Sequence, residues 1–332
     1  MLKTVRDACT PHPGVFKDDP LDDIDDLVKV RADLDEAREF FARSHTTAGM
    51  RQLFEQGLRR LAGTSDQGVF ELTQAMGGGK THSLVAFGLL AQHPTLRASV
   101  VPEISASAPF ETARVVTFTG RRYPDHYFWG DIAEQLGRPE LFRRFWSEVA
   151  GAPDADDWVE LIGDEPTLIL LDELPPWFEY AVTRRVGDGN LAQVATAALS
   201  NLLVAALRLP RLCIVLSNLS GTFQDAAKEL RRAIKNAAAE ARRQAKPITP
   251  VDLGGDEIYQ ILKKRLFDRL PSDDDIETVT QAYVDAITEA EKSKAVAKTE
   301  TQWAGVTLKL RDAHAALGLR GTTFSGTSTA IL

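Results

Sequence analysis

The sequence predicts an α/β fold of three layers, in which helices cover a mostly parallel five-stranded sheet and a partial helical lid follows. Two observations support this prediction. Apolar runs alternate with helical patterns, which is typical of strands buried on both faces of a parallel sheet. Polar residues come directly after several of these runs, at the strand ends where open α/β sheets bind ligands. We therefore expect the functional site at the carboxyl edge of the sheet.

The composition favours a globular protein with a sizeable core and without a disulfide framework. The chain has 332 residues, of which 44% are hydrophobic and 26% are charged, so it can bury a sizeable core. Its net charge of −8 argues against a protein that coats nucleic acid, although it does not exclude a local basic groove. The only cysteines are Cys9 and Cys213, so we expect no disulfide framework, and a reducing cytoplasm fits this count.

We expect neither a signal peptide nor a membrane span. The N-terminus has no long apolar segment behind it. The most apolar helical stretch, residues 191–209, is interrupted by polar side chains at Gln193, Thr196, Ser200 and Asn201. This pattern favours a buried helix over a helix that crosses a bilayer.

The chain is expected to divide into four segments. These are an irregular acidic N-terminal segment (residues 1–38), an α/β core (39–254), a partial helical lid (255–292) and a poorly ordered tail (293–332). The first segment is rich in aspartate and proline, which favours a solvated entry segment over an interaction patch. The tail is rich in glycine, serine and threonine and has little to bury.

Strand and helix patterns then follow in order. Apolar residues at helical spacing predict helix between Leu34 and Leu61. The first predicted strand begins at Val69. The other predicted strands cover residues 113–119, 167–173, 211–218 and 248–251. The other predicted helices cover residues 81–90, 127–150, 191–209, 256–270 and 276–290. Pro250 cannot donate to a strand ladder, so the last strand is expected at an edge of the sheet or to end there. The aromatic residues of 127–150 favour a core role over a base-stacking platform.

One stretch combines a strand, a glycine-rich loop and a helix. It reads Val69-Phe-Glu-Leu-Thr-Gln-Ala-Met-Gly-Gly-Gly-Lys-Thr-His-Ser-Leu84. Glycines let successive backbone N–H groups turn inward, and the N-terminus of the next helix points at the same place, so the stretch can bind an anion. Lys80 would contact the β- and γ-phosphates of ATP, and the Thr81 hydroxyl would ligate Mg²⁺.

The loop departs from the common phosphate-binding pattern at its first position, where Gln74 replaces glycine. The alternative interpretation is a glycine turn with a chance Lys-Thr pair. His82 is expected to be a helix residue beside the site, not a catalyst. The predicted nucleotide-binding residues are Gln74, Ala75, Met76, Gly77, Gly78, Gly79, Lys80, Thr81 and His82.

The strand predicted at residues 167–173 ends in two adjacent carboxylates, Asp172 and Glu173. At the carboxyl edge of a parallel sheet they would face the ligand of the glycine loop. We expect Asp172 to hold Mg²⁺, directly or through water, and Glu173 to deprotonate the attacking water. Taken alone, an apolar run followed by two carboxylates is as typical of a strand that ends in an acidic turn as it is of a metal site.

The strand predicted at residues 211–218 ends in Ser217 and Asn218. Asn218 is expected to contact the γ-phosphate or the attacking water, and the alternative is an asparagine that only ends the strand in a turn. The predicted catalytic residues are therefore Lys80, Glu173 and Asn218.

A basic helical stretch covers residues 223–246. Three interpretations stay open: a solvated helix face, the source of an arginine finger for a neighbouring subunit, and a nucleic-acid contact surface. Arg242 and Arg243 are the candidate finger residues. No aromatic residues are interleaved to support the nucleic-acid surface. The histidines are scattered, and the sequence predicts no Cys/His metal cluster.

The assembled motifs resemble those of the AAA+ and related ATPases of the additional-strand P-loop class, in which a catalytic Glu directly follows the Mg²⁺-binding Asp. More narrowly, Phe70–His82 and Leu168–Leu174 look like the motifs of a bacterial family of large ATPases, the DUF499 type. In that family Gln74 would be a family trait. The resemblance covers about residues 40–290. Members are usually much longer, so the chain is expected to correspond to their N-terminal ATPase part.

The resemblance implies a P-loop NTPase fold that hydrolyses ATP with Mg²⁺ to drive conformational change. Members often lie in phage-defence gene clusters beside DNA methyltransferases, which implies a DNA-linked role in the cytoplasm without a membrane. The implied partners are further copies of the chain or a larger defence complex, with a possible direct DNA contact. The alternative is a nucleotide-binding switch or assembly module with little turnover, which a partial lid favours.

Overall fold

The structure is a computed structural model of the chain and describes residues 9–12, 26–74, 79–123, 125–146, 151–219, 245–252 and 256–292. The chain forms two compact units. The sheet unit comprises residues 23–42 and 46–252. The terminal unit comprises residues 1–22, 43–45 and 253–332.

The centre of the sheet unit is a parallel sheet of five strands in the order β3-β4-β7-β2-β8. These strands are β2 (Val69–Gln74), β3 (Arg114–Thr119), β4 (Thr167–Asp172), β7 (Leu212–Leu219) and β8 (Lys246–Ile248). The predicted α/β class and the five-stranded sheet are confirmed. The last strand is an edge strand, as Pro250 predicted, but it covers residues 246–248 and not the predicted 248–251.

Two apolar layers cover the sheet, one on each face, because the side chains of each strand alternate between the faces. All six residues of β4 are buried. Ile169 and Leu171 join one core cluster, whereas Leu168 and Leu170 join the other. A continuous apolar run is therefore what this central position requires.

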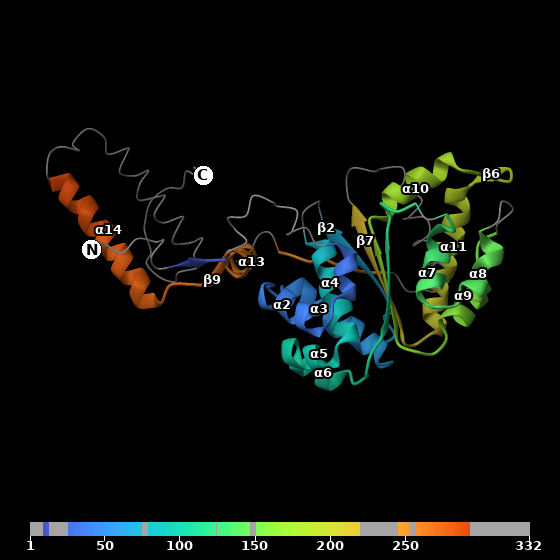
Figure 1. Cartoon of the computed structure of the whole chain (residues 1–332), viewed down its shortest axis with the longest axis horizontal. Coiled ribbons are helices and arrows are strands. Elements are labelled where there is room, and N and C mark those ends of the chain that lie inside the picture. Colours follow the sequence, from blue (N-terminus) through green and yellow to red (C-terminus); the bar gives the residue numbers. More distant parts are fainter. Residues whose placement is uncertain are drawn as a thin grey trace. The chain divides into compact units, whose positions relative to one another are not determined.

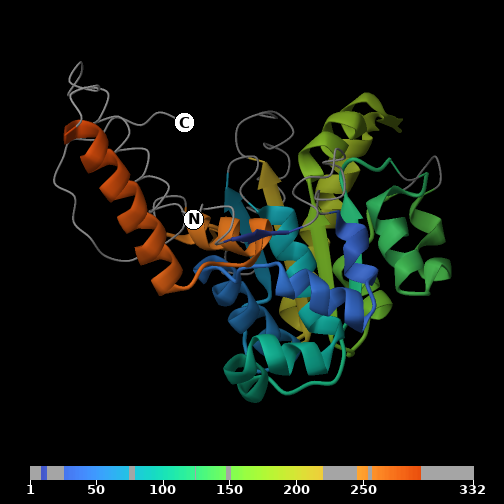
Figure 2. The same ribbon diagram turned by 60° about the vertical axis from the view of Figure 1, so that its left-hand side comes forward.

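The helices divide between these two clusters, and Figures 1 and 2 show the two groups on opposite sides of the strands. One face carries η3 (Leu27–Arg31), α2 (Leu34–Ala42), α3 (Ala48–Leu61), α4 (Lys80–Gln92), α5 (Pro94–Val100) and α6 (Pro102–Ser107). The other carries α7 (Tyr127–Gln135), α8 (Pro139–Phe142), η4 (Arg143–Phe145), α9 (Ala155–Ile162), α10 (Leu174–Thr183) and α11 (Leu191–Arg208). A short hairpin of β5 (Arg185–Val186) and β6 (Gly189–Asn190) connects α10 to α11.

Two predicted helices are broken in the structure. The helix expected between residues 34 and 61 is α2 and α3, and the Thr47 hydroxyl starts the second by accepting a hydrogen bond from the Met50 N–H at 3.1 Å. The helix expected at 127–150 stops at Gln135, because Gly137 is left-handed (φ 73°) and Pro139 begins a new turn. The aromatic residues of this stretch lie in the core, as expected; Phe128, Trp129 and Phe142 are buried.

Part of the N-terminal segment that we expected to be irregular is ordered. Asp26 caps the 3₁₀ helix η3, whose Leu27 and Val30 are buried. Val30 packs against Gly88 of α4 so closely that an added Cβ at Gly88 would lie 2.8 Å from Val30 Cγ1. The 3₁₀ helix η3 therefore forms within a polar segment and buries the apolar side chains of Leu27 and Val30.

Helix α11 is the one helix among the described residues that is long and apolar enough to cross a membrane. Of this helix, 61% is buried inside the protein, mainly against α9, α10 and β7. It is a core helix of the α/β fold, as its polar interruptions predicted.

The terminal unit contains β1 (Thr10–Pro11), α13 (Glu257–Leu266), β9 (Phe267–Arg269) and α14 (Asp273–Lys292). The helix predicted to Leu270 ends at Leu266, because residues 267–269 pair antiparallel with β1. None of the residues of α13 is buried, and Leu262 of its predicted apolar face is 40% exposed. The second predicted helix is present as α14. The predicted tail, residues 293–332, lies outside the described residues.

Candidate functional site

Three strand ends bring the predicted site residues to one edge of the sheet. Strand β7 lies between β2 and β4, and all three run parallel. The Gly79-Lys80-Thr81 segment follows β2, Asp172 ends β4, and Ser217 lies near the end of β7. Because parallel strands place their carboxyl ends together, these groups meet although they are far apart in the sequence.

A hydrogen bond joins the two halves of the predicted site. The Thr81 hydroxyl donates to Asp172 Oδ2 at 2.7 Å, across 91 positions of sequence. Asp172 is only 4% exposed. The pair thus places an alcohol oxygen and a carboxylate side by side at the start of α4.

Ser217 holds the other side of the acidic pair. Its hydroxyl donates to Asp172 Oδ1, and its oxygen accepts the Glu173 N–H at 3.2 Å. Leu171 pairs with Leu216 in the sheet, so the next residue of each strand, Asp172 and Ser217, lie side by side. The serine fixes both the carboxylate and the backbone of the residue that follows it.

Lys80 begins helix α4 and is 7% exposed. Burial lowers the pKa of its ammonium group, and the negative charges of Asp172 and Glu173 oppose that shift. Gly79 caps the helix in the left-handed region (φ 72°), where a side chain would be strained. The Ser83 hydroxyl donates to the Gly79 carbonyl at 2.8 Å and reinforces this turn.

Glu173 is bound by an arginine from the neighbouring strand end. Arg121 Nε donates to Glu173 Oε2, and a terminal nitrogen of the same guanidinium donates to Oε1 at 2.9 Å. These bonds raise the pKa of the Arg121 guanidinium. Both carboxylate oxygens of Glu173 are therefore engaged by one side chain.

The backbone that carries Glu173 is unusual. Glu173 has φ 49°, in the left-handed region that non-glycine residues rarely adopt, immediately before α10 begins. Gly120, which follows β3, donates its N–H to the Asp172 carbonyl at 2.8 Å. A Cβ at Gly120 would lie 1.8 Å from the Glu173 carbonyl oxygen, so only glycine fits there.

A pocket of about 400 Å³ opens beside these groups. Its polar lining includes Arg31, Thr81, Arg121, Arg122, Asp172 and Glu173. The lining thus combines three arginines with three acidic residues, namely the acidic pair and Asp26, and η3 forms one wall. Such a mixture of charges suits a ligand with several negative charges that binds together with a metal cation.

Other predicted site residues are only partly described. Gln74 ends β2 and Asn218 lies in β7, but their side chains are not described. Residues 75–78 and the predicted arginine-finger residues, Arg242 and Arg243, lie outside the described residues. His82 stacks on Phe40 with ring centroids 4.7 Å apart, on the first turn of α4.

Two residues of the site were not predicted. Ser217 was passed over for its neighbour Asn218, although a polar residue that immediately follows the apolar run 212–216 was a usable signal. Arg121 had no local signal, because its role depends on β3 lying next to β4 in the sheet.

The comparison with known families matches part of this region. A family model described as the DUF499 N-terminal domain matches residues 16–99, which include η3, α2 to α4 and the segment of the glycine loop. The matched range ends before the acidic pair on β4. No curated protein matches the chain. Residues 16–99 are therefore similar to the DUF499 N-terminal domain, the type that the motif around Lys80 resembles.

Proposed function

We propose that the chain binds ATP with Mg²⁺ at the carboxyl edge of the sheet and hydrolyses it to drive conformational change. The observation that carries this proposal is the hydrogen bond of 2.7 Å between Thr81 and Asp172. It unites the end of the glycine loop with the acidic end of a buried strand, which are the two halves of a nucleotide and magnesium site. The buried ammonium of Lys80 lies at the same helix start.

The donor set suits Mg²⁺, which prefers hard oxygen ligands. The Thr81 hydroxyl and Asp172 Oδ2 converge, and Ser217 orients Asp172 by its other oxygen. When bound, the ion would bridge the phosphates and neutralise part of the charge that develops on them. Thr81 and Asp172 would hold it.

The protein groups then have separate tasks. Lys80 binds the β- and γ-phosphates with its ammonium group, and the backbone of the glycine loop cradles them. Glu173 orients the attacking water and accepts its proton. Asn218, which lies in β7 next to β4, is proposed to contact the γ-phosphate. Because both oxygens of Glu173 accept from Arg121, we expect the carboxylate to turn from the guanidinium when it orients this water.

The pairing of Glu173 with Arg121 supports a second candidate function. A carboxylate whose two oxygens both accept from Arg121 is oriented toward the guanidinium and not toward an attacking water. If the pair persists when ATP is bound, the chain is a nucleotide-binding switch with little turnover. The two candidates therefore differ in what ATP does to one ion pair.

The wider setting of the proposal rests on resemblance. We place the chain among AAA+-like P-loop ATPases, as part of a DNA-linked phage-defence system in the cytoplasm. Further copies of the chain or a larger complex are the proposed partners, with Arg242 or Arg243 as the source of an arginine finger. A specific activity that rises with protein concentration would support such assembly, and a flat one would oppose it.

The test measures ATP binding and hydrolysis together, with Mg²⁺, on the wild type and three variants. Lys80→Ala should lose both binding and turnover, whereas Glu173→Gln should keep binding and lose turnover. Glu179→Gln removes a carboxylate from the exposed face of α10 and should change neither.

Each outcome of this test separates the candidates. Turnover in the wild type that is lost in Glu173→Gln supports the ATPase. Tight binding without turnover in the wild type supports the switch. Absence of Mg²⁺-dependent ATP binding in the wild type would contradict both.

A further inference from the structure

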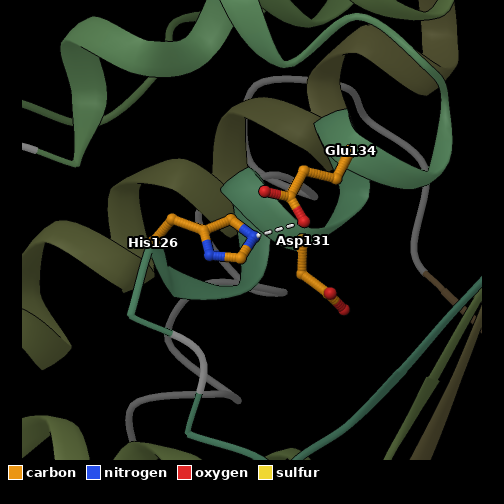
Figure 3. A group of neighbouring side chains, drawn as sticks. All are labelled: His126, Asp131 and Glu134. Atoms are coloured by element: carbon orange, nitrogen blue, oxygen red, sulfur yellow. Dashed lines mark ion pairs between the residues drawn. The ribbon is translucent and has the colours of Figure 1, made fainter.

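A second cluster of metal-ligating side chains lies at α7 and the residue before it, on the same face of the sheet as α10 and α11. It consists of His126, Asp131 and Glu134, whose ligand atoms all lie within 4.8 Å of one another. Figure 3 shows the imidazole of His126 and the carboxylate of Glu134 pointing toward one another, with Asp131 beside them. We propose that these three residues bind a divalent transition-metal ion, at a site separate from the proposed nucleotide site.

Local sequence brings the three groups together. Asp131 and Glu134 are three residues apart on α7, so they lie on one helix face. His126 precedes the helix and folds back over Gly130. An added Cβ at Gly130 would lie 2.5 Å from His126 Cδ2 and 2.7 Å from Trp146 Cε3. The missing side chain therefore makes room for the imidazole beside the next turn of the helix.

A neighbouring amide fixes the orientation of Asp131. Gln135 Nε2 donates to Asp131 Oδ2 at 3.1 Å. The same amide group binds both backbone groups of Thr117 on the edge strand β3, accepting its N–H at 3.0 Å and donating to its carbonyl at 2.8 Å. The sheet thus positions Asp131 through Gln135, which leaves Oδ1 for a ligand. Such support from a neighbouring group is typical of metal sites.

The imidazole is placed as a ligand would be. Its Nε2 atom is buried and pairs with Glu134 Oε2 at 3.2 Å, although this contact lacks the geometry of a hydrogen bond. Burial raises the pKa of the Asp131 carboxyl, while the positive charge of Arg122 opposes that shift. A cation between the imidazole and the two carboxylates would satisfy the nitrogen and offset the burial of Asp131.

Only small movements would complete the site. Two ligands bound to one tetrahedral ion at about 2.1 Å lie roughly 3.4 Å apart. The largest separation between the ligand atoms would therefore have to shrink by up to about 1.4 Å to reach that spacing. Glu134 can make this adjustment because its side chain is 54% exposed. Its exposure also provides an entry path from solvent.

The mixture of ligands indicates the class of ion. One nitrogen with two carboxylates suits Zn²⁺, Mn²⁺ or Fe²⁺ better than Mg²⁺ or Ca²⁺, which prefer oxygen alone. Three protein ligands leave a coordination position for water. We take Zn²⁺ as the probe ion.

The test titrates the full chain with Zn²⁺ in excess Mg²⁺, which occupies the proposed nucleotide site, and measures bound zinc by calorimetry and elemental analysis. The wild type should bind one equivalent. Glu134→Gln and Asp131→Asn should each weaken binding at least about 10-fold. Glu140→Gln, which neutralises an exposed carboxylate on the next helix, should bind zinc as the wild type does.

The result would overturn the proposal if the wild type bound no zinc, or if Glu134→Gln and Asp131→Asn bound it as tightly as the wild type. In either case the cluster is an ion pair of His126 with Glu134 and nothing more. Because Glu134 is exposed, its variant should fold, and circular dichroism verifies this for both variants. ATP binding by the variants should stay unchanged, which separates a failure of this site from a failure of the nucleotide site.

Discussion

Arg121 holds Glu173 by two parallel hydrogen bonds that connect the ends of the neighbouring strands β3 and β4. The side chain of Arg121 is 68% exposed and that of Glu173 is 18% exposed, so solvent screens the pair. Exposed pairs of this kind contribute about 1 kcal/mol or less. The proposed catalytic base can therefore leave the pair at a modest cost.

We predict that Arg121→Ala raises the basal kcat for ATP. If release of Glu173 costs about 1 kcal/mol, its removal should raise kcat by up to about fivefold. Steady-state phosphate release measures this effect. Arg144→Gln is the matched control, because Arg144 pairs with Asp157 and not with Glu173. A fall in kcat would contradict the prediction and would assign Arg121 a role on the nucleotide itself.

Ser217→Ala should weaken both the fold and the use of Mg²⁺. Ser217 is fully buried, and the variant would leave Asp172 Oδ1 and the Glu173 N–H without their partner. Loss of such a buried partner costs about 1–3 kcal/mol. Denaturant unfolding should show this loss, and turnover should need more Mg²⁺.

Ser200→Ala provides the comparison for Ser217→Ala. Ser200 is a buried serine on α11, and its variant should leave the Mg²⁺ requirement unchanged. An equal Mg²⁺ requirement for Ser217→Ala and the wild type would show that Ser217 does not orient Asp172.

The sheet was predictable because its strands carry their burial in their own sequence. Residues 168–171 form one apolar run, and that composition is typical of a strand covered on both faces. The same holds for residues 212–216 of β7, all of which are buried. Strand order was not predicted, since it depends on pairings between distant segments.

Helix ends were less predictable, for two different reasons. The break after Gln135 had a local signal, Gly137 followed by Pro139, which the helical spacing obscured. The end of α13 at Leu266 had none, because residues 267–269 leave the helix to pair with β1 at the other end of the chain. A long-range partner therefore overrode an amphipathic pattern.

The candidate site divides in the same way. The glycine loop and the Asp172-Glu173 pair were predicted because each is a local motif whose chemistry is fixed by its residues. Arg121 was not, because it reaches Glu173 only through the adjacency of two strands. Neither was the α7 cluster, because His126 becomes a neighbour of Glu134 only when Gly130 lets the imidazole fold back.

Gly120→Ala should be strongly destabilising. Its new methyl group would lie 1.8 Å from the Glu173 carbonyl oxygen and 2.6 Å from the carbonyl carbon, and neither backbone atom can rotate away. We expect a loss of about 2 kcal/mol or more in the free energy of unfolding, with reduced turnover as Glu173 is displaced. Gly151→Ala is the control, because nothing lies within 4 Å of an added Cβ there. Equal stability of the two variants would show that the β3 and β4 ends are not packed so closely.

The pH dependence of ATP binding should report on Lys80. Burial lowers the pKa of its ammonium group below the ordinary lysine value, so the group loses its proton and its attraction for phosphate sooner as pH rises. Affinity should therefore fall through the alkaline range by up to about tenfold per pH unit, the limit for one linked proton. Fluorescence titration with a nucleotide analogue measures it. Lys80→Arg should bind more weakly but without this fall, because its guanidinium stays charged. A parallel decline in both proteins would assign the pH dependence to another group.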